Sequence, residues 1–344
     1  MTVLVAIRHG DVEVRDAAPA GAHAVLSLDD GMLVTPQASG RVRTVDESDP
    51  AALAQRWAAH MRSGFVASDA ALLAVWNERG DLPALSWSDE TPGPVVPVEA
   101  GTQGVHSSVV PAEAGTQGIH LHGLYAIVDS VPRLRQVLDA GIRLTQLRIK
   151  LPHDADAAWF AKLRVQLRDG ITTARDMGAT LFINDHWRIA AELGAQAVHL
   201  GQEDLLALGE AGRAELASAG MALGVSSHAV WELCRARQLA PAYIACGPVW
   251  ATTTKDMPWR PQGLDNLGWW VARAQRPVVA IGGILAPQQV LETARAGAQA
   301  VCLVRGLGDD PRQTVPVFQA AFDEGAAERA APTRWPHPSL EPKR

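Results

Sequence analysis

The chain has 344 residues, of which 47% are hydrophobic and 20% are charged, a composition that is typical of folded globular proteins and excludes a disordered one. Its 31 lysines and arginines against 37 aspartates and glutamates give a net charge of -6, so the chain as a whole does not attract nucleic acid or an anionic membrane. No apolar run approaches the roughly 20 residues that span a bilayer. From the charge and the missing apolar run together, we expect neither nucleic acid nor a membrane as a partner.

The start of the chain and its cysteines predict a cytoplasmic protein. The apolar residues 3–7 are too few for the core of a signal peptide. Cys234, Cys246 and Cys302 show no CxxC spacing, so they predict neither a disulfide framework nor a cysteine-rich metal site. We therefore expect reduced thiols, and the sequence leaves a homo-oligomer open.

Residues 1–90 are predicted to form a small α/β region. Residues 3–7 and 24–28 have the composition of short strands, and helical periodicity runs from Pro50 to Trp76, with Asp69 as an N-cap. Residues 91–121 are predicted to be a flexible linker, because Gly and Pro punctuate them and residues 95–106 return almost unchanged at 109–120. Two copies are too few for a solenoid, and a binding role for the repeat is the alternative.

From residue 124 onward, short apolar runs alternate with segments of helical periodicity. The predicted strands are 124–129, 144–149, 180–184, 197–201, 222–226, 243–249, 277–283 and 300–305. The clearest helical segments between them are 157–167, 186–193, 230–239 and 287–296. Continuous apolar strands separated by amphipathic helices indicate a parallel sheet buried on both faces.

Eight such units predict an α/β fold of the (βα)8 or TIM-barrel type over residues 122–328, followed by a flexible tail at 329–344. A doubly wound sheet is the alternative. That fold would place a glycine-rich phosphate turn after the first strand, where this sequence has Asp129-Ser130-Val131-Pro132.

The second predicted strand brings polar groups to one face. Gln146, Arg148 and Lys150 alternate along it, and alternate residues of a strand point the same way. Two cations and an amide at the carboxyl end of a barrel strand suit an anionic, phosphate-bearing ligand. A solvated ion-pair network is the alternative reading of these charges.

Two carboxylates follow the third and fourth predicted strands, Asp185 and Asp204. Together with phosphate oxygens and water they form a ligand set that Mg²⁺ takes. A turn at Asp185 and an N-cap at Asp204 are compatible with that role. His199 is predicted to be a satisfied core or rim histidine, whereas His186 and His228 are expected to donate hydrogen bonds and not to bind zinc.

Later strand ends predict a second anion site. Ser226 ends the fifth strand and His228 follows it, and a hydroxyl-rich loop ending in Lys255 follows the sixth. Glycines around Gly283 and after Arg305 follow the last two strands, where barrels commonly bind phosphate. Two phosphorylated small-molecule substrates are therefore expected.

These motifs together resemble the thiamine phosphate synthase family over residues 123–325. The matching motifs are Gln146-Leu147-Arg148-Ile149-Lys150, Phe182-Ile183-Asn184-Asp185, His199-Leu200-Gly201-Gln202-Glu203-Asp204, Gly224-Val225-Ser226, Gly247-Pro248 with Thr252-Thr253-Thr254-Lys255, and Ile281-Gly282-Gly283-Ile284. The resemblance implies a transferase that joins 4-amino-2-methyl-5-hydroxymethylpyrimidine diphosphate to a thiazole phosphate, with Mg²⁺ as cofactor and pyrophosphate as the second product.

The resemblance also implies a role for individual residues. Contacts to the pyrimidine diphosphate fall on Gln146, Arg148, Lys150, Asn184, Ser226 and Lys255, and those to the thiazole phosphate on Thr252, Thr254, Gly283, Val304 and Arg305. The Mg²⁺ ligands fall on Asp185 and Asp204, and the catalytic groups are Arg148, Lys150, Ser226 and Lys255. Arg305 departs from the family pattern, which usually has Ser there, and the spacing from Asp204 to Ser226 is a few residues long.

The sequence is compatible with two other functions. A thiazole tautomerase of the same superfamily needs no diphosphate site and would use His228 as acid and base. A non-catalytic barrel that binds thiamine precursors is the other. Residues 51–76 resemble the late helices of pyrimidine kinases of thiamine biosynthesis, but the glycine-rich anion hole of such a kinase is missing, which predicts a remnant without catalysis.

Overall fold

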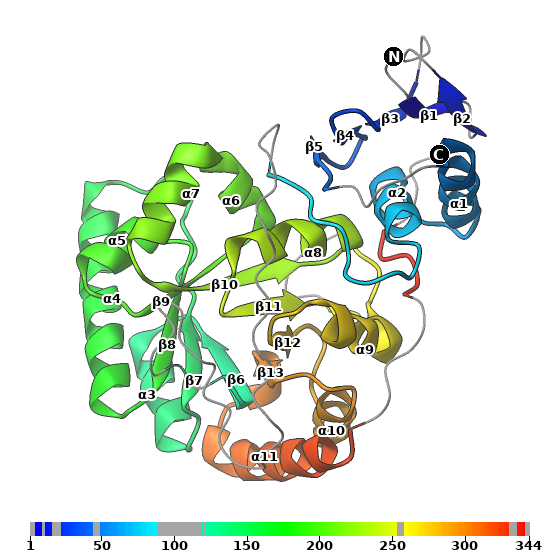
Figure 1. The fold of residues 1–344 in the computed structure, drawn as a ribbon. Coiled ribbons are helices and arrows are strands. Elements are labelled where there is room, and N and C mark those ends of the chain that lie inside the picture. Colours follow the sequence, from blue (N-terminus) through cyan, green and yellow to red (C-terminus); the bar gives the residue numbers. More distant parts are fainter. Residues whose placement is uncertain are drawn as a thin grey trace.

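The computed structural model describes residues 4–8, 11–15, 22–43, 49–87, 119, 121–252, 258–329 and 336–340. A small antiparallel sheet with two helices forms the N-terminal region, and a closed barrel with outer helices forms the rest (Figure 1). Among the residues so described, no helix is both long and apolar enough to cross a membrane.

The N-terminal sheet has the strand order β2-β1-β3-β4-β5. Its strands are β1 (Leu4–Arg8), β2 (Asp11–Arg15), β3 (Ala24–Ser27), β4 (Met32–Val34) and β5 (Ser39–Arg41), and the two helices are α1 (Pro50–Arg62) and α2 (Ala67–Trp76). Helix α1 starts as the sequence predicts, because Asp49 accepts a hydrogen bond from the Ala52 amide at 3.0 Å and Pro50 opens the first turn. Helix α2 does not start at the predicted cap Asp69. Its N-cap is Val66, and Asp69 lies inside the first turn.

The barrel is closed by eight parallel strands, which confirms the predicted fold class. The strands are β6 (Gly123–Val128), β7 (Leu144–Leu147), β8 (Thr180–Asn184), β9 (Ala197–Leu200), β10 (Ala222–Ser227), β11 (Tyr243–Cys246), β12 (Val278–Ala280) and β13 (Ala300–Leu303). Strand β13 pairs with β6, and β9 pairs with β10, so no sheet edge is left open in the barrel. The carboxyl ends of all eight strands therefore meet at one rim.

Helices pack around the outside of this barrel (Figure 1). They are α3 (Val131–Asp139), α4 (Ala157–Asp176), α5 (Trp187–Glu192), α6 (Gln202–Ala207), α7 (Gly209–Ser218), α8 (Val230–Ala236), α9 (Gly263–Arg273), α10 (Pro287–Arg295) and α11 (Pro311–Ala327), with short 3-10 turns η1 (Arg237–Leu239) and η2 (Arg305–Leu307). The segment between Asp204 and Ser226 contains the end of α6 and the whole of α7. The break between α6 and α7 lies at Leu208, and Gly209, the first residue of α7, has a positive φ of 64° that suits glycine.

The barrel interior is filled by apolar side chains and closed from below by the segment before β6. Ile119 and Leu121 are 2% and 0% exposed and belong to the same buried cluster as Leu144 and Ala300, which lie near the starts of their strands. The remainder of the duplicated segment predicted as a linker lies outside the described residues. Part of the predicted flexible tail is packed: His337 exchanges hydrogen bonds with Asn266 of α9, and Leu340 forms a bridge with Trp259.

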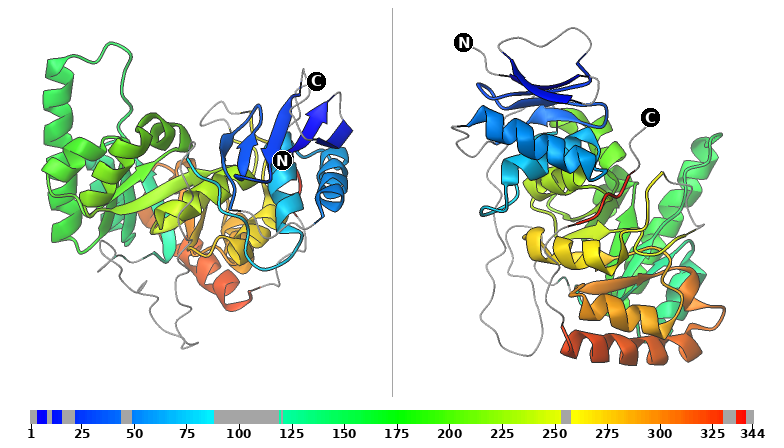
Figure 2. Two further views of the ribbon diagram at one scale, coloured as in Figure 1. Left: turned by 45° about the horizontal axis from the view of Figure 1, so that its top comes forward. Right: turned by 90° about the vertical axis from the view of Figure 1, so that its right-hand side faces the viewer.

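The N-terminal region packs on the barrel, and α2 faces α8 (Figure 2). Its sheet residues belong to the same continuous buried cluster as the barrel's outer shell. Trp76 of α2 and Trp269 of α9 meet edge to face with their ring centroids 5.8 Å apart, and Arg273 lies over the Trp76 ring at 4.9 Å. Apolar burial therefore joins the two parts of the chain into one core.

Candidate functional site

A chain of hydrogen bonds crosses the barrel interior just below the rim. Gln146 Nε2 donates to the Tyr125 hydroxyl at 3.1 Å, and the two tyrosine hydroxyls, of Tyr125 and Tyr243, lie 2.9 Å apart. The Tyr243 hydroxyl lies 2.7 Å from His199 Nδ1, and His199 Nε2 lies 2.8 Å from Ser226 Oγ. Five strands, β6, β7, β9, β10 and β11, thus contribute one polar side chain each to a network that spans the barrel.

The side chains of this network are uncharged, and its hydrogen bonds all run in the same direction, from Gln146 to Ser226. Burial, followed by the positive charges of Arg148 and His228, lowers the pKa of His199 to about 3, so its ring carries a single N–H. Burial also raises the pKa of both tyrosine hydroxyls, which keeps them protonated. Because the Gln146 amide donates at one end, each hydroxyl passes its proton onward, and His199 Nε2 donates to Ser226 Oγ. The Ser226 hydroxyl proton is then left for a ligand at the rim.

Two carboxylates and a guanidinium lie together beside this network. Burial raises the pKa of Asp185, the charge of Asp204 raises it further, and Arg148 opposes both. Asn184 donates a side-chain hydrogen bond to Asp185, and Asp204 accepts one from the Gly201 amide at 3.0 Å. Asp185 has a positive φ of 65°, which turns the chain sharply at the end of β8.

These residues fit a divalent cation. Two carboxylates that repel each other gain from a shared positive charge, and Mg²⁺ takes such oxygen ligands together with phosphate oxygens and water. Within the described ranges no group of three or more His, Cys, Asp or Glu side chains is gathered for a metal, so a cation here would draw its remaining ligands from elsewhere. Over the same residues, Arg148 forms no ion pair.

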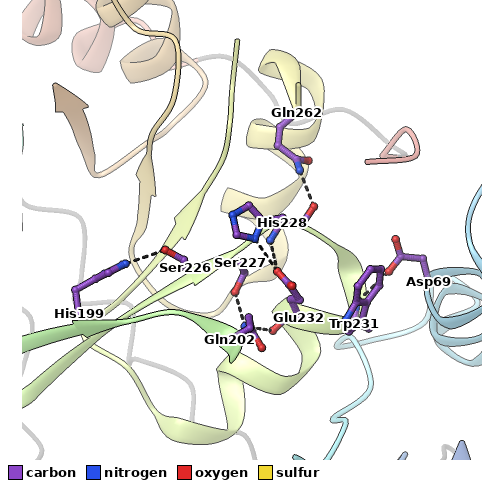
Figure 3. Close-up of polar contacts among 9 residues, drawn as sticks. All are labelled: Asp69, His199, Gln202, Ser226, Ser227, His228, Trp231, Glu232 and Gln262. Atoms are coloured by element: carbon purple, nitrogen blue, oxygen red, sulfur yellow. Dashed lines mark hydrogen bonds and ion pairs between the residues drawn. The ribbon is translucent and has the colours of Figure 1, made fainter. Parts of the chain in front are cut away.

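The loop between β10 and α8 holds a histidine in a fixed orientation (Figure 3). One carboxylate oxygen of Glu232 accepts hydrogen bonds from the His228 amide at 2.6 Å and lies 3.0 Å from His228 Nδ1. The Trp259 ring stacks on the His228 ring with centroids 5.1 Å apart and planes 8° apart, and Gln262 Nε2 donates to the His228 carbonyl at 2.6 Å. Nδ1 is thereby occupied, and Nε2 is the nitrogen that can meet a ligand.

The loops after β12 and β13 lie close to the loop after β11. Gly283 has a positive φ of 72°, and a Cβ there would meet the Ala251 carbonyl oxygen and Trp250 Cβ at 2.7 Å each. A Cβ at Gly306 would meet the Ile284 carbonyl oxygen at 2.7 Å, so the β12 and β13 loops also touch. Arg305 begins η2 in this place, next to the exposed Val304.

The structure brings most of the predicted site residues to the rim but does not place all of them. Gln146 and Ser226 are joined by the network, and Arg148, Asn184, Asp185 and Asp204 share one electrostatic neighbourhood. Lys150 is exposed on the loop beyond β7. Thr252 lies at the edge of the described part, and Thr254 and Lys255 lie outside it.

Sequence reasoning missed Tyr125, Tyr243 and Glu232. The chain has only two tyrosines, and both occur inside apolar strand runs, which was a usable signal for buried polar groups. Glu232 stands in the first turn of α8 and reaches back to His228, the residue before the N-cap, which is the position where a first-turn Glu commonly pairs with the chain ahead of a helix. His199 is the satisfied buried histidine that the sequence predicted, with a partner on each ring nitrogen.

Comparison with known proteins finds a matching family model and several similar proteins. Residues 124–307 match the family model described as thiamine monophosphate synthase. A thiamine-phosphate synthase from Neisseria meningitidis is 41% identical over 206 residues, covering 58% of this chain and 94% of that protein. One from Escherichia coli is 45% identical over 163 residues, covering 47% of this chain and 73% of that protein. The solved thiamine phosphate pyrophosphorylase from Pyrococcus furiosus is 24% identical with a TM-score of 0.49, covering 60% of this chain and 97% of that one.

Proposed function

The chain belongs to the thiamine monophosphate synthase family, and on that premise we propose that it joins 4-amino-2-methyl-5-hydroxymethylpyrimidine diphosphate to thiazole phosphate, forming thiamine phosphate and releasing pyrophosphate. The observation that carries the proposal is the pairing of a neutral recognition network with a charged cluster of Arg148, Asp185 and Asp204 at the same barrel rim. A neutral heteroaromatic ring and a diphosphate need these two environments side by side.

The hydrogen-bond network supports recognition of the pyrimidine ring. An aminopyrimidine presents an amino group, which donates, beside a ring nitrogen, which accepts. Ser226 has a hydroxyl proton left for the ring nitrogen, and Gln146 uses its Nε2 in the network, so its carbonyl oxygen is the part that can accept from the amino group. We assign Asn184 to the same substrate.

The charged cluster supports binding of the diphosphate. We assign Asp185 and Asp204 as the residues that hold Mg²⁺, and Arg148, Lys150 and Lys255 as the cations that bind the diphosphate oxygens. When bound, Mg²⁺ supplies positive charge against the charge that develops on the leaving pyrophosphate. Arg148 adds a guanidinium at the same place, where partial burial makes its charge more effective than in water.

The thiazole phosphate is assigned to the loops after β11, β12 and β13. Gly283 lets the backbone approach a phosphate closely, and the Val304 and Arg305 segment lies beside it through the contact at Gly306. Thr252 and Thr254 supply hydroxyl donors from the neighbouring loop. Arg305, in place of the family's usual serine, contributes a second cation for this phosphate.

The reaction needs no nucleophilic side chain. The carbon–oxygen bond to the diphosphate breaks first, the aminopyrimidine stabilises the resulting cation, and the thiazole nitrogen then forms the new carbon–nitrogen bond. The residues at the rim hold both substrates in reach and stabilise the departing charge. Among the described residues, Ser226 is hydrogen-bonded to a histidine whose pKa lies near 3, which makes that histidine a poor base for activating a nucleophile.

A second candidate reaction is favoured by one feature of the site. Glu232 orients His228 so that Nε2 can exchange a proton with a ligand, which suits the thiazole tautomerase of the same superfamily. The paired Asp185 and Asp204 have no task in that reaction, so we place it second.

A turnover assay separates the two reactions. The full chain is incubated with both phosphorylated substrates and Mg²⁺, and released pyrophosphate is counted together with thiamine phosphate. Thiazole isomerisation is followed in parallel. Equal amounts of pyrophosphate and thiamine phosphate support the proposal, whereas isomerisation without pyrophosphate would reject it in favour of the tautomerase.

We further propose that the reaction is cytoplasmic and that the enzyme forms a homo-oligomer.

A further inference from the structure

Helix α8 is buried on every side, which is unusual for the outer layer of a barrel. All seven of its residues are buried, although an outer barrel helix ordinarily exposes one face. The cover comes from the N-terminal region: Arg235 Nε donates to the Ser86 carbonyl at 3.0 Å, and Arg237 donates to the Leu82 carbonyl at 2.9 Å. Helix α8 therefore lies between the barrel and the N-terminal region.

Asp69 of α2 provides the cap that α8 lacks. The N-cap residue of α8 is Ala229, which has no side-chain oxygen to offer. Asp69 Oδ1 accepts a hydrogen bond from the Trp231 amide in the first turn at 2.9 Å, and the Asp69 side chain is almost fully buried at 1% exposure (Figure 3). A donor that would be orphaned at a buried helix start is thus satisfied from 162 residues earlier in the chain.

The capped turn is continuous with the rim. Trp231 packs its ring against Trp259 at 5.6 Å, and Trp259 stacks on His228. The residue after Trp231 is Glu232, which holds His228 through both its amide and its ring. Ser226 lies two positions before His228 on the same strand end, so the first turn of α8 fixes the segment that carries both side chains.

We propose that Asp69 is a positioning residue of the active site, and that the N-terminal region is a working part of the enzyme through it. The inference rests on the proposed function for one point, that Ser226 binds the pyrimidine substrate. Loss of the Asp69 acceptor leaves a buried amide unpaired and loosens the start of α8. The segment with Ser226 and His228 then loses its fixed position. Within the described residues, no hydrogen bond joins Asp69 to the loops around Gly283 and Arg305.

The selectivity of this effect distinguishes positioning from general stability. Asp69→Ala is expected to raise the KM for the pyrimidine diphosphate about tenfold, the scale of one lost buried hydrogen bond, and to leave the KM for thiazole phosphate within about twofold. Asp69→Asn keeps an oxygen acceptor for the Trp231 amide and is expected to restore both values. Arg273→Ala is the matched control, since it weakens the same interface at Trp76 without touching α8, and it is expected to lower stability with neither KM changed.

Hydrogen exchange gives a readout that does not depend on turnover. Amides 226–236 are expected to exchange faster in Asp69→Ala than in the wild type, and at the wild-type rate in Asp69→Asn. Unchanged exchange would overturn the role of Asp69. Faster exchange with an unchanged pyrimidine KM, or with both KM values raised equally, would overturn the link to the active site. If Asp69→Ala does not fold, Asp69→Ser, whose shorter side chain cannot reach Trp231, is held to the same criteria. If the wild type shows no turnover, the proposed function is rejected, while the hydrogen-exchange result still decides whether Asp69 fixes the start of α8.

Discussion

The ionisation of Asp69 makes a quantitative prediction for stability against pH. Burial is the main reason that the pKa of this carboxyl is raised from an ordinary value of 3.8 to about 8; the hydrogen bond from the Trp231 amide opposes the rise, and the nearby Glu232 charge contributes to it. Between these two values the folded protein holds a proton that the unfolded chain has lost. Stability contributed by the protonated form is therefore complete below pH 3.8 and is lost progressively as the pH rises toward 8.

The size of the loss follows from the pKa difference. Each pH unit inside that window costs about 1.4 kcal/mol of unfolding free energy for one such group. From pH 5.5 to pH 7.5 the wild type should lose about 2–3 kcal/mol through Asp69. Asp69→Asn keeps the acceptor for Trp231 but cannot ionise, so this component should vanish.

Urea unfolding at pH 5.5 and 7.5 measures the effect as a difference. The buried histidines, of which His199 has the most strongly lowered pKa, contribute the opposite slope, but they contribute it equally to both proteins. Subtracting the wild-type pH dependence from that of Asp69→Asn therefore isolates Asp69. Equal pH dependence in the two proteins would refute the assignment of a protonated, buried Asp69.

Four further substitutions test the site. Tyr243→Phe removes the hydroxyl that joins Tyr125 to His199, so the KM for the pyrimidine diphosphate should rise about tenfold, and an unchanged KM would speak against the network. Asp185→Ala, and equally Lys255→Ala, should lower kcat by about a hundredfold or more with the fold intact by circular dichroism, and near-normal turnover in both would defeat charge neutralisation. Gly283→Ala strains a positive φ and meets Ala251, so stability should fall by about 1–3 kcal/mol and the KM for thiazole phosphate should rise; a fully stable variant with normal KM would contradict the close approach.

The barrel was predictable because its signals are local. Each strand is a short apolar run and each helix has its own periodicity, so strands such as Thr180–Asn184 and Ala222–Ser227 agree with the prediction to within a residue. The rim followed from one geometric rule, that parallel strands of a barrel present their carboxyl ends together. Gln146, Asp185 and Asp204 could be grouped on that basis alone.

The contacts that cross long stretches of chain could not be predicted. The hydroxyls of Tyr125 and Tyr243 meet across 118 residues, and only the closed barrel places β6 near β11. The prediction of Asp69 as the N-cap of its own helix is wrong, because the N-cap of α2 is Val66 and the Asp69 carboxylate accepts a hydrogen bond from the first turn of α8. Its position just before an apolar run carries no information about α8. The burial of α8 likewise depends on how two parts of the chain dock, which local periodicity does not encode.

The central claim is that charge at one rim of the barrel removes pyrophosphate from a pyrimidine ring held by a neutral network. The most direct measurement is product formation by Arg148→Ala beside the wild type, with thiamine phosphate and pyrophosphate quantified in the same samples at saturating Mg²⁺. The account predicts equal molar amounts of the two products from the wild type and a loss of at least about a hundredfold in kcat for the variant. Wild-type turnover without thiamine phosphate, or a variant that works at the normal rate, would contradict it.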